Sequence, residues 1–137
     1  GGMECTAMIL LDTQIWVRWL ISDKIDSELT DLIENSEQVC ISSISCWEVV
    51  YLAKRGRMEL PIPAEKWIDV GLSETHMTCL PIDQQIAVLA ANLPDHHRDP
   101  ADRIIIATAI THGAKLISFD EQFREYDELH GLLLPDK

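Results

Sequence analysis

The sequence predicts an α/β fold in which a mostly parallel central sheet of four to five strands is flanked by helices. Short apolar segments alternate with longer segments that carry apolar residues at helical spacing, and this alternation is typical of strand–helix–strand units. The strand segments are apolar on both faces, as in QVCIS and KLISF, which indicates a sheet covered on both sides. We therefore expect a three-layer sandwich.

Five segments are strand candidates, namely residues 8–11, 38–42, 77–80, 115–119 and a short segment at 132–134. Helical patterns lie between them at residues 13–21, 25–35, 45–55, 64–74, 84–92 and 100–112. Gly56 and Gly113 indicate helix ends, and Asp83 and Asp99 indicate helix starts. Pro100 suits the first position of the last helix.

Length and composition predict one soluble globular domain, residues 3–137. The chain has 137 residues, of which 47% are apolar, and a domain of this size buries roughly 68 to 70% of its unfolded surface. Gly1 and Gly2 before the first methionine are interpreted as an expression scar. No apolar run approaches the ~18 residues of a membrane span, so we expect no membrane contact and a cytoplasmic location. The cysteines lack C-x-x-C spacing, which favours buried free thiols over a zinc site or disulfides.

The net charge of −12 argues against a protein that holds nucleic acid by bulk electrostatics, because phosphate binding normally draws on clustered lysine and arginine. Any contact with nucleic acid must then be local. Two local basic groups are candidates for substrate binding, and they consist of Lys54, Arg55 and Arg57 around Gly56, and Arg98 and Arg103 around DPAD. For the first group, a helix C-terminus whose cations complement the helix dipole is an equally good explanation.

Four acidic residues far apart in the chain occupy positions that such a fold would bring to one edge of the sheet. Asp12 and Asp120 follow apolar strands, and Asp102 lies in the first turn of a helix. Glu48 joins them if its helix begins near Ser43 or Ser45. At ~4 Å and an effective dielectric of about 20, each pair of carboxylates repels by roughly 4 kcal/mol. A divalent cation is the usual way to hold such groups ionised together.

Each acid also has a simpler structural explanation. Asp12 and Asp120 both precede helical patterns and suit helix N-caps. Ser45 and Glu48 fit a capping box, in which Glu48 bonds back to the Ser45 amide. Asp99 before Pro100 fits an N-cap, so we assign the cation to Asp102 instead. Local patterns alone leave these alternatives open.

Together, however, four segments resemble in order and spacing the acidic motifs of PIN-domain ribonucleases, most of all the VapC toxins of bacterial toxin–antitoxin pairs. The segments are LLDTQIWVRWL, ISSISCWEVVYLAKRGRMELP, LPDHHRDPADRIIIATA and AKLISFDEQF. The resemblance covers nearly the whole chain and implies a PIN-like fold. It places the family's metal-binding and catalytic carboxylates on Asp12, Glu48, Asp102 and Asp120. It also places a small polar residue at Ser43 and another at Ser118, where threonine is frequent, while Ala101 stands where a bulky apolar residue is common.

The resemblance implies hydrolysis of RNA phosphodiester bonds with Mg²⁺ or Mn²⁺, cations that prefer oxygen ligands. We expect Asp12 and Asp102 to bind the cation directly, and Glu48 and Asp120 to bind partly through water. The hydroxyls that would position water or ligands are those of Thr13, Ser43 and Ser118. The implied partners are the RNA substrate, a second copy in a homodimer, and a cognate antitoxin whose arginine competes with the metal for the acids. An acidic enzyme of this kind should select its RNA rather than cleave every RNA.

Other interpretations stay open. His96 and His97 beside Asp99 suggest the His and Asp ligands of HD phosphohydrolases, but those folds are wholly helical. A phospho-receiver-like module also gathers acids at strand ends, yet it needs a lysine after a late strand, whereas Lys115 precedes one. A PIN fold without catalytic activity would keep the same architecture. For Trp16, Trp19 and Trp47 core packing is favoured, and a groove for a partner is the alternative.

Overall fold

The protein forms one sheet of five parallel strands, described here from a computed structural model that covers residues 8–21 and 26–135. The strands are β1 (Met8–Leu11), β2 (Gln38–Ser42), β3 (Thr78–Leu80), β4 (Lys115–Ile117) and β5 (Leu133–Leu134). They lie in the order β3-β2-β1-β4-β5, and each neighbouring pair is parallel. The predicted α/β class and the parallel central sheet are confirmed.

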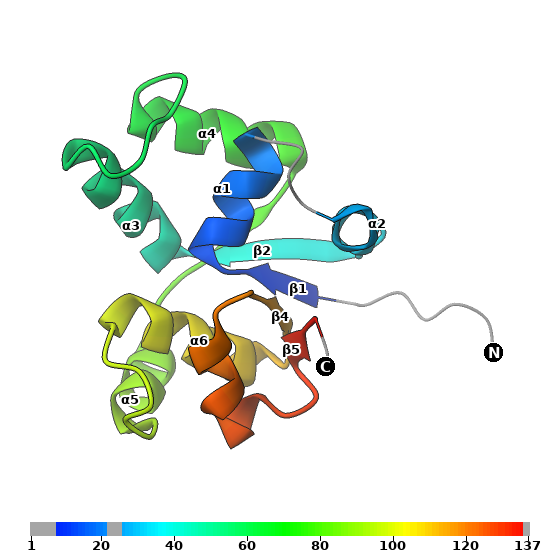
Figure 1. The fold of residues 1–137 in the computed structure, drawn as a ribbon, viewed down its shortest axis with the longest axis vertical. Coiled ribbons are helices and arrows are strands. Elements are labelled where there is room, and N and C mark those ends of the chain that lie inside the picture. Colours follow the sequence, from blue (N-terminus) through cyan, green and yellow to red (C-terminus); the bar gives the residue numbers. More distant parts are fainter. Residues whose placement is uncertain (1–7, 22–25, 136–137) are drawn as a thin grey trace.

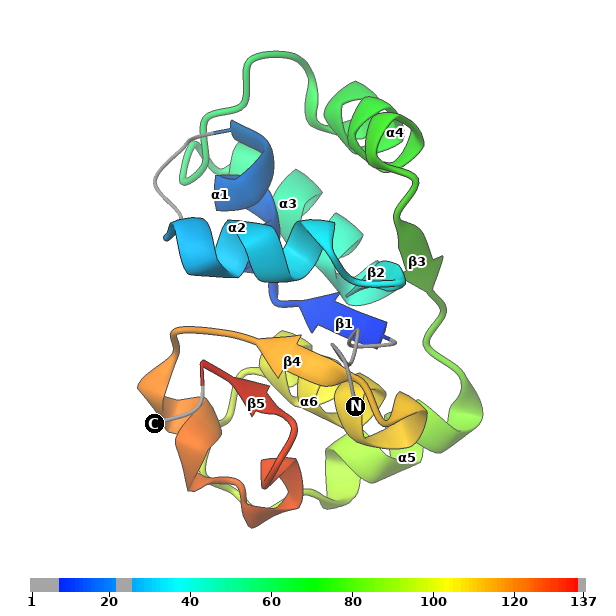
Figure 2. The same cartoon turned by 90° about the vertical axis from the view of Figure 1, so that its right-hand side faces the viewer.

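Helices cover both faces of this sheet and complete three layers (Figures 1 and 2). One face carries α1 (Thr13–Ile21), α2 (Ser27–Glu34), α3 (Ser43–Lys54) and α4 (Ala64–Thr75). The other carries α5 (Gln84–Asn92), α6 (Pro100–His112) and two 3-10 turns, η1 (Glu121–Glu125) and η2 (Asp127–Leu129). In the described ranges, no helix has the length and apolar character needed to cross a membrane.

The apolar strands divide their side chains between two cores. Ile9 and Leu11 of β1 pack into the core under α1 to α4, whereas Leu10 packs into the core under α6. This alternation follows from the two-residue period of a strand. Because both sets of side chains are fully buried, a strand apolar on both faces is what the fold requires.

The aromatic residues of α1 and α3 differ in their surroundings. Trp16 is fully buried, with its ring 5.0 Å from that of Trp67, and Trp19 is partly buried against the same core. The core interpretation is therefore confirmed for Trp16. It is wrong for Trp47, which is 55% exposed and stacks on Tyr51 with centroids 4.7 Å apart, because it lies on the outer side of α3.

Several predicted boundaries shift for local reasons. Helix α3 begins at Ser43 rather than at residue 45, because the Ser42 side chain accepts a hydrogen bond from the Ile44 amide at 3.1 Å and caps the helix. Strand β4 ends at Ile117, two residues earlier than expected. Helix α2 begins after its cap Asp26, and residue 25 of the predicted helix lies outside the described residues.

Of the cysteines, Cys40 is a buried free thiol, Cys46 and Cys79 are half-buried free thiols, and Cys5 is not among the described residues.

The strand order places a natural binding site at the carboxyl edge of β1. The chain runs from β1 outward through β2 to β3, and then returns to β4 and β5 on the other side of β1. Ligands of open α/β sheets bind at such a reversal of strand order. The amide of Asp12 donates to the Ile117 carbonyl at 3.1 Å, so the segments after β1 and β4 meet directly at this edge.

Candidate metal centre

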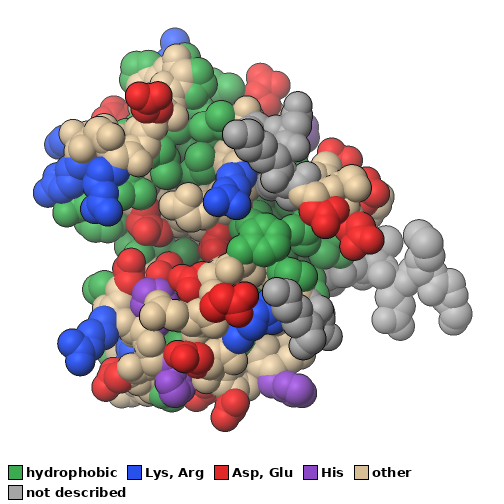
Figure 3. Space-filling model, viewed as in Figure 1, with side chains coloured by type: hydrophobic (Ala, Val, Ile, Leu, Met, Phe, Trp, Pro, Cys, Tyr) green, Lys and Arg blue, Asp and Glu red, His purple; other side chains and the backbone are tan. Residues whose placement is uncertain are grey.

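All four predicted acids line one pocket of about 360 Å³ at this carboxyl edge. Asp12 comes from the end of β1, Glu48 from α3, Asp102 from the first turn of α6, and Asp120 from the segment after β4. Figure 3 shows acidic side chains gathered across the middle of the molecule, between its upper and lower halves. Segments that are remote in sequence thus bring four carboxyl groups into one hollow.

Asp12 is the most buried of these acids, with 7% of its surface exposed. Its Oδ1 accepts a hydrogen bond from the Ile15 amide at 2.8 Å, so the predicted capping role is present as well. The Ser118 hydroxyl bonds to Asp12 and accepts from the Asp120 amide at 3.1 Å, which ties the two acids together. Burial raises the pKa of Asp12, the bonds from Ser118 and Ile15 oppose that rise, and the charge of Asp120 adds to it.

Glu48 is held by a chain of hydroxyls rather than by a capping box. The Thr13 hydroxyl donates to Glu48 Oε1 at 2.5 Å. Thr13 Oγ1 also lies 2.8 Å from Ser45 Oγ, and because its single proton is used on Glu48, Ser45 is the donor in that pair. Burial raises the pKa of Glu48, the bond from Thr13 counteracts this, and the nearby acids Asp99 and Asp12 raise it further.

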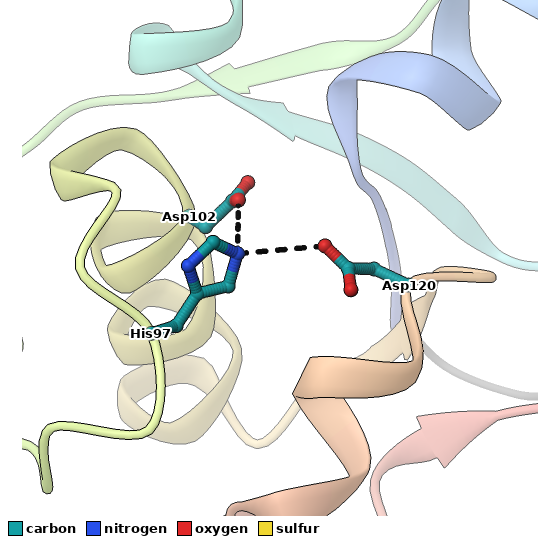
Figure 4. A group of neighbouring side chains, drawn as sticks. All are labelled: His97, Asp102 and Asp120. Carbon is teal, nitrogen blue, oxygen red and sulfur yellow. Dashed lines mark ion pairs between the residues drawn. The ribbon is translucent and has the colours of Figure 1, made fainter.

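Asp102 and Asp120 face each other across an imidazole (Figure 4). His97 Nε2 lies 2.7 Å from Asp102 Oδ2 and 3.4 Å from Asp120 Oδ2. Burial, followed by repulsion from Asp99, Glu48, Asp120 and Asp12, raises the pKa of Asp102 to about 8. Burial is thus a larger cause than the mutual repulsion that the sequence suggested.

The donor set suits a hard divalent cation. Carboxylate oxygens are the ligands that Mg²⁺ and Mn²⁺ prefer, and one ligand atom from each of His97, Asp102 and Asp120 lies within 4.8 Å of the others. Burial first, and then repulsion between the acids, raises the pKa of Asp12, Glu48 and Asp102, so both causes disfavour their ionised forms. A cation would favour the ionised carboxylates and relieve that cost.

The PIN domain family model matches residues 9–129. This chain belongs to the PIN domain family. Ribonuclease VapC22 of Mycobacterium tuberculosis (strain ATCC 25618 / H37Rv) is 32% identical over 120 residues, which cover 86% of this chain and 91% of the relative. The resemblance drawn from the acidic motifs is therefore confirmed.

Solved structures agree with this assignment. A chain of VapBC2 from Rickettsia felis bound to a promoter DNA fragment superimposes with a TM-score of 0.70 at 20% identity, covering 92% of this chain and 96% of that one. A toxin–antitoxin complex from Klebsiella pneumoniae gives a TM-score of 0.63 at 26% identity, with 88% and 93% covered. At 20% identity the first likeness shows the fold alone. The PIN-like three-layer architecture is the shared feature.

Within this PIN domain, the predicted hydroxyls are placed unequally. Thr13 and Ser118 contact Glu48 and Asp12 respectively. Ser43 begins α3 and is half-buried, but it is not among the residues that line the pocket. Ser45, for which the sequence suggested only a capping role, is fully buried and is the hydroxyl on that helix that contacts Thr13. The two residues lie about 200° apart around the helix, so only packing could distinguish them.

The predicted basic residues do not share one place. The Arg103 guanidinium points into the protein and donates to five carbonyls at 2.6 to 3.2 Å, those of Ala90, Ala91, Leu93, Pro94 and His97. All five of its N–H groups are engaged there, so Arg103 organises the α5–α6 connector, and its contact with RNA stays a prediction. Arg98 is exposed on that connector.

The remaining basic group, Lys54, Arg55 and Arg57, is exposed and gathers at the end of α3 (Figure 3). Arg55 lies 3.9 Å from the centre of the Tyr51 ring, and Lys54 occupies the last turn of the helix. The helix-dipole explanation and substrate contact are compatible at this position. Among the described residues that line the pocket itself, Arg18 of α1 supplies the basic side chain, and its charge lowers the pKa of Asp12. Arg18 was not among the residues predicted from the sequence. Its place on the helix that directly follows Asp12 was the available signal that its side chain could reach the pocket.

Proposed function

We propose that this PIN domain protein is a divalent-metal-dependent endoribonuclease that hydrolyses RNA phosphodiester bonds. The convergence of Asp12, Glu48, Asp102 and Asp120 on one pocket carries the proposal. The relative VapC22 bears the name ribonuclease, which supports RNA as the substrate. The same four residues are the proposed catalytic set.

We assign Mg²⁺ or Mn²⁺ to the acids of this pocket. Bound there, such a cation lowers the pKa of a coordinated water and neutralises charge on the phosphate under attack. Asp12 and Asp102 are the proposed direct ligands, and Glu48 and Asp120 act partly through water. Thr13 holds Glu48 and is itself bonded to Ser45, and Ser118 holds Asp12 against the Asp120 segment.

The pocket and its rim favour a selective rather than an indiscriminate nuclease. The net charge of −12 repels RNA at long range, so binding depends on the cation and on local basic side chains. Arg18 at the pocket, Arg98 on the connector and the group at the end of α3 are the proposed contacts. Shape and unpaired bases would then decide which RNA reaches the acids.

We further propose that the protein is the toxin of a toxin–antitoxin pair and works in the cytoplasm. Support comes from the toxin–antitoxin complex of Klebsiella pneumoniae that shares this fold. An antitoxin arginine would find a cluster of carboxylates in the pocket and could form charge-assisted bonds with them. A homodimer is also proposed, since exposed apolar side chains such as Trp47 and Val88, which are 55% and 52% exposed, could be covered by a second copy.

Cleavage of a total RNA pool tests the enzyme proposal. The protein is incubated with Mg²⁺ or Mn²⁺, with EDTA, and as the Asp12→Asn variant, which keeps the shape of the side chain but removes its charge. We expect discrete cleavage that requires the metal and falls by at least about 100-fold in the variant, as removal of one key electrostatic group typically does.

Asp31→Asn is the matched control, because Asp31 is exposed on α2 and undergoes the same chemical change. It should cleave like the parent. If folded Asp12→Asn protein retained full activity, the assigned site would be wrong. If no RNA were cleaved with either metal, the alternative of a PIN fold acting only as a binding module would take its place.

A further inference from the structure

An imidazole stands between two of the proposed metal-binding carboxylates. His97 lies on the connector between α5 and α6, and its side chain is only 13% exposed. It points its Nε2 at Oδ2 of Asp102 and of Asp120, at 2.7 and 3.4 Å (Figure 4). These two acids come from α6 and from the segment after β4, so His97 links two separate segments of the pocket.

The second ring nitrogen indicates which way the proton points. The Asp99 amide donates to His97 Nδ1 at 3.4 Å, and a nitrogen that accepts a hydrogen bond carries no proton of its own. In the neutral ring the proton therefore sits on Nε2, where it faces Asp102. His97 thus turns its protonated nitrogen toward the acids, at ion-pair distance from both.

The backbone that carries His97 is also held in place. The His97 carbonyl accepts from Arg103 Nη1 at 3.0 Å and from the Tyr126 hydroxyl at 3.5 Å. Arg103 binds four more carbonyls of the same connector and its neighbouring helix end. The ring centre lies 6.0 Å from that of Phe123. An imidazole fixed in this way loses little conformational entropy when it pairs with the acids.

Asp120 is anchored on its other oxygen as well. The Gln122 amide donates to Asp120 Oδ1 at 2.9 Å, while Oδ2 faces the imidazole. Each carboxylate oxygen can accept more than one bond, so these contacts orient the acids without using all of their ligand capacity.

We propose that His97 is a positioning residue for the metal centre, whose Nε2 lies at ion-pair distance from both Asp102 and Asp120 and so keeps the two carboxylates facing one site. The inference rests on the proposed function and deepens it. Donors that orient ligating carboxylates typically change metal affinity by about 10- to 100-fold when they are removed.

Metal binding by the full-length protein tests this, measured as the Mn²⁺ dissociation constant by calorimetry and by electron paramagnetic resonance of free Mn²⁺. Two amide variants form a matched pair that differs by one methylene. In His97→Gln the amide nitrogen can reach the position of Nε2, whereas in His97→Asn it falls short. We expect His97→Asn to weaken Mn²⁺ binding by about 10- to 100-fold and His97→Gln to restore most of it.

His96→Gln is the control, because His96 contacts the Tyr126 ring rather than the acids. It should bind Mn²⁺ like the parent, and thermal melts check that each variant is folded. Equal affinity of the parent and folded His97→Asn would overturn the inference, as would a Gln variant no tighter than the Asn variant. Strong ¹⁴N coupling to bound Mn²⁺ that disappears in His97→Gln would also overturn it, because His97 would then be a direct ligand. If the parent bound no Mn²⁺, the metal centre of the proposed function would itself fail.

Discussion

The buried Asp102 predicts that the metal-free protein loses stability as the pH rises. Burial and four neighbouring acids raise the pKa of Asp102 from 3.8 to about 8. A carboxyl with a raised pKa in the folded state binds its proton more tightly there, so protonation favours folding. The stability that protonated Asp102 contributes is fully present below pH 3.8 and is lost progressively as the pH rises toward about 8. Asp102→Asn keeps a neutral side chain at every pH and should remove the loss.

The magnitude follows from the interval between the two pKa values. Between 3.8 and about 8, each pH unit costs about 1.4 kcal/mol of the free energy of unfolding, so the loss caused by Asp102 has a ceiling of roughly 6 kcal/mol. Relaxation and water penetration reduce it, because the side chain keeps 20% of its surface exposed. One third of the ceiling, about 2 kcal/mol, corresponds to a rise in Tm of roughly 6 to 10 °C for a domain of this size.

Thermal unfolding in EDTA measures this difference. We expect Asp102→Asn to melt above the parent at pH 8.5 and to have a much smaller advantage at pH 5. Asp99, Glu48, Asp120, Asp12 and His97 surround the group and are present in both proteins, so the difference between the variants reports the change at Asp102. Added Mn²⁺ should reverse the order, since the parent gains stability from binding and the variant has lost a proposed ligand.

Asp31→Asn again serves as the control and should leave the pH dependence of Tm unchanged. A folded Asp102→Asn variant that melted below the parent in EDTA at pH 8.5 would contradict the raised pKa of Asp102. An equal gain in Tm at both pH values would contradict it as well, because a pH-independent gain cannot come from a titrating carboxyl.

Three further outcomes are expected. Thr13→Val should destabilise the protein by about 1 to 3 kcal/mol in urea unfolding, because it removes the donor to Glu48 and leaves a buried serine hydroxyl unpaired; an unchanged midpoint would contradict the hydroxyl chain. Arg103→Lys should lower stability by about 2 to 4 kcal/mol and expose the α5–α6 connector to protease, since a lysine cannot reach five carbonyls at once; loss of RNA affinity with normal stability would support its predicted role in substrate binding. Trp16→Ala should lower the free energy of unfolding by about 3 to 5 kcal/mol, whereas Trp47→Ala should lower it by under about 1 kcal/mol. Trp47→Ala should also reduce self-association in light scattering. Equal losses of stability in the two variants would show that Trp47 is also part of the core.

Much of the fold could be predicted because its signals are local. Residues 8–11 are apolar without interruption, as expected of a strand buried on both faces. Asp83 and Asp99 begin helices where their side chains accept from backbone amides. The prediction of a capping box at Ser45 was wrong, because the local pattern on which it rested does not show where the helix begins. Serine and glutamate at that spacing suit a cap, but Ser42 occupies the cap and the helix begins two residues earlier.

That acids follow buried strands at one edge of a parallel sheet can be read from the chain alone, because strand period and helix capping depend on neighbouring residues. The partner of each polar side chain, in contrast, depends on how the layers pack. This packing turned Arg103 onto backbone carbonyls, placed Ser45 rather than Ser43 against Thr13, and brought His97 between Asp102 and Asp120. A partner remote in the chain depends on helix rotation and packing, and burial, which dominates the pKa of Asp102, exists only once the layers have closed around it.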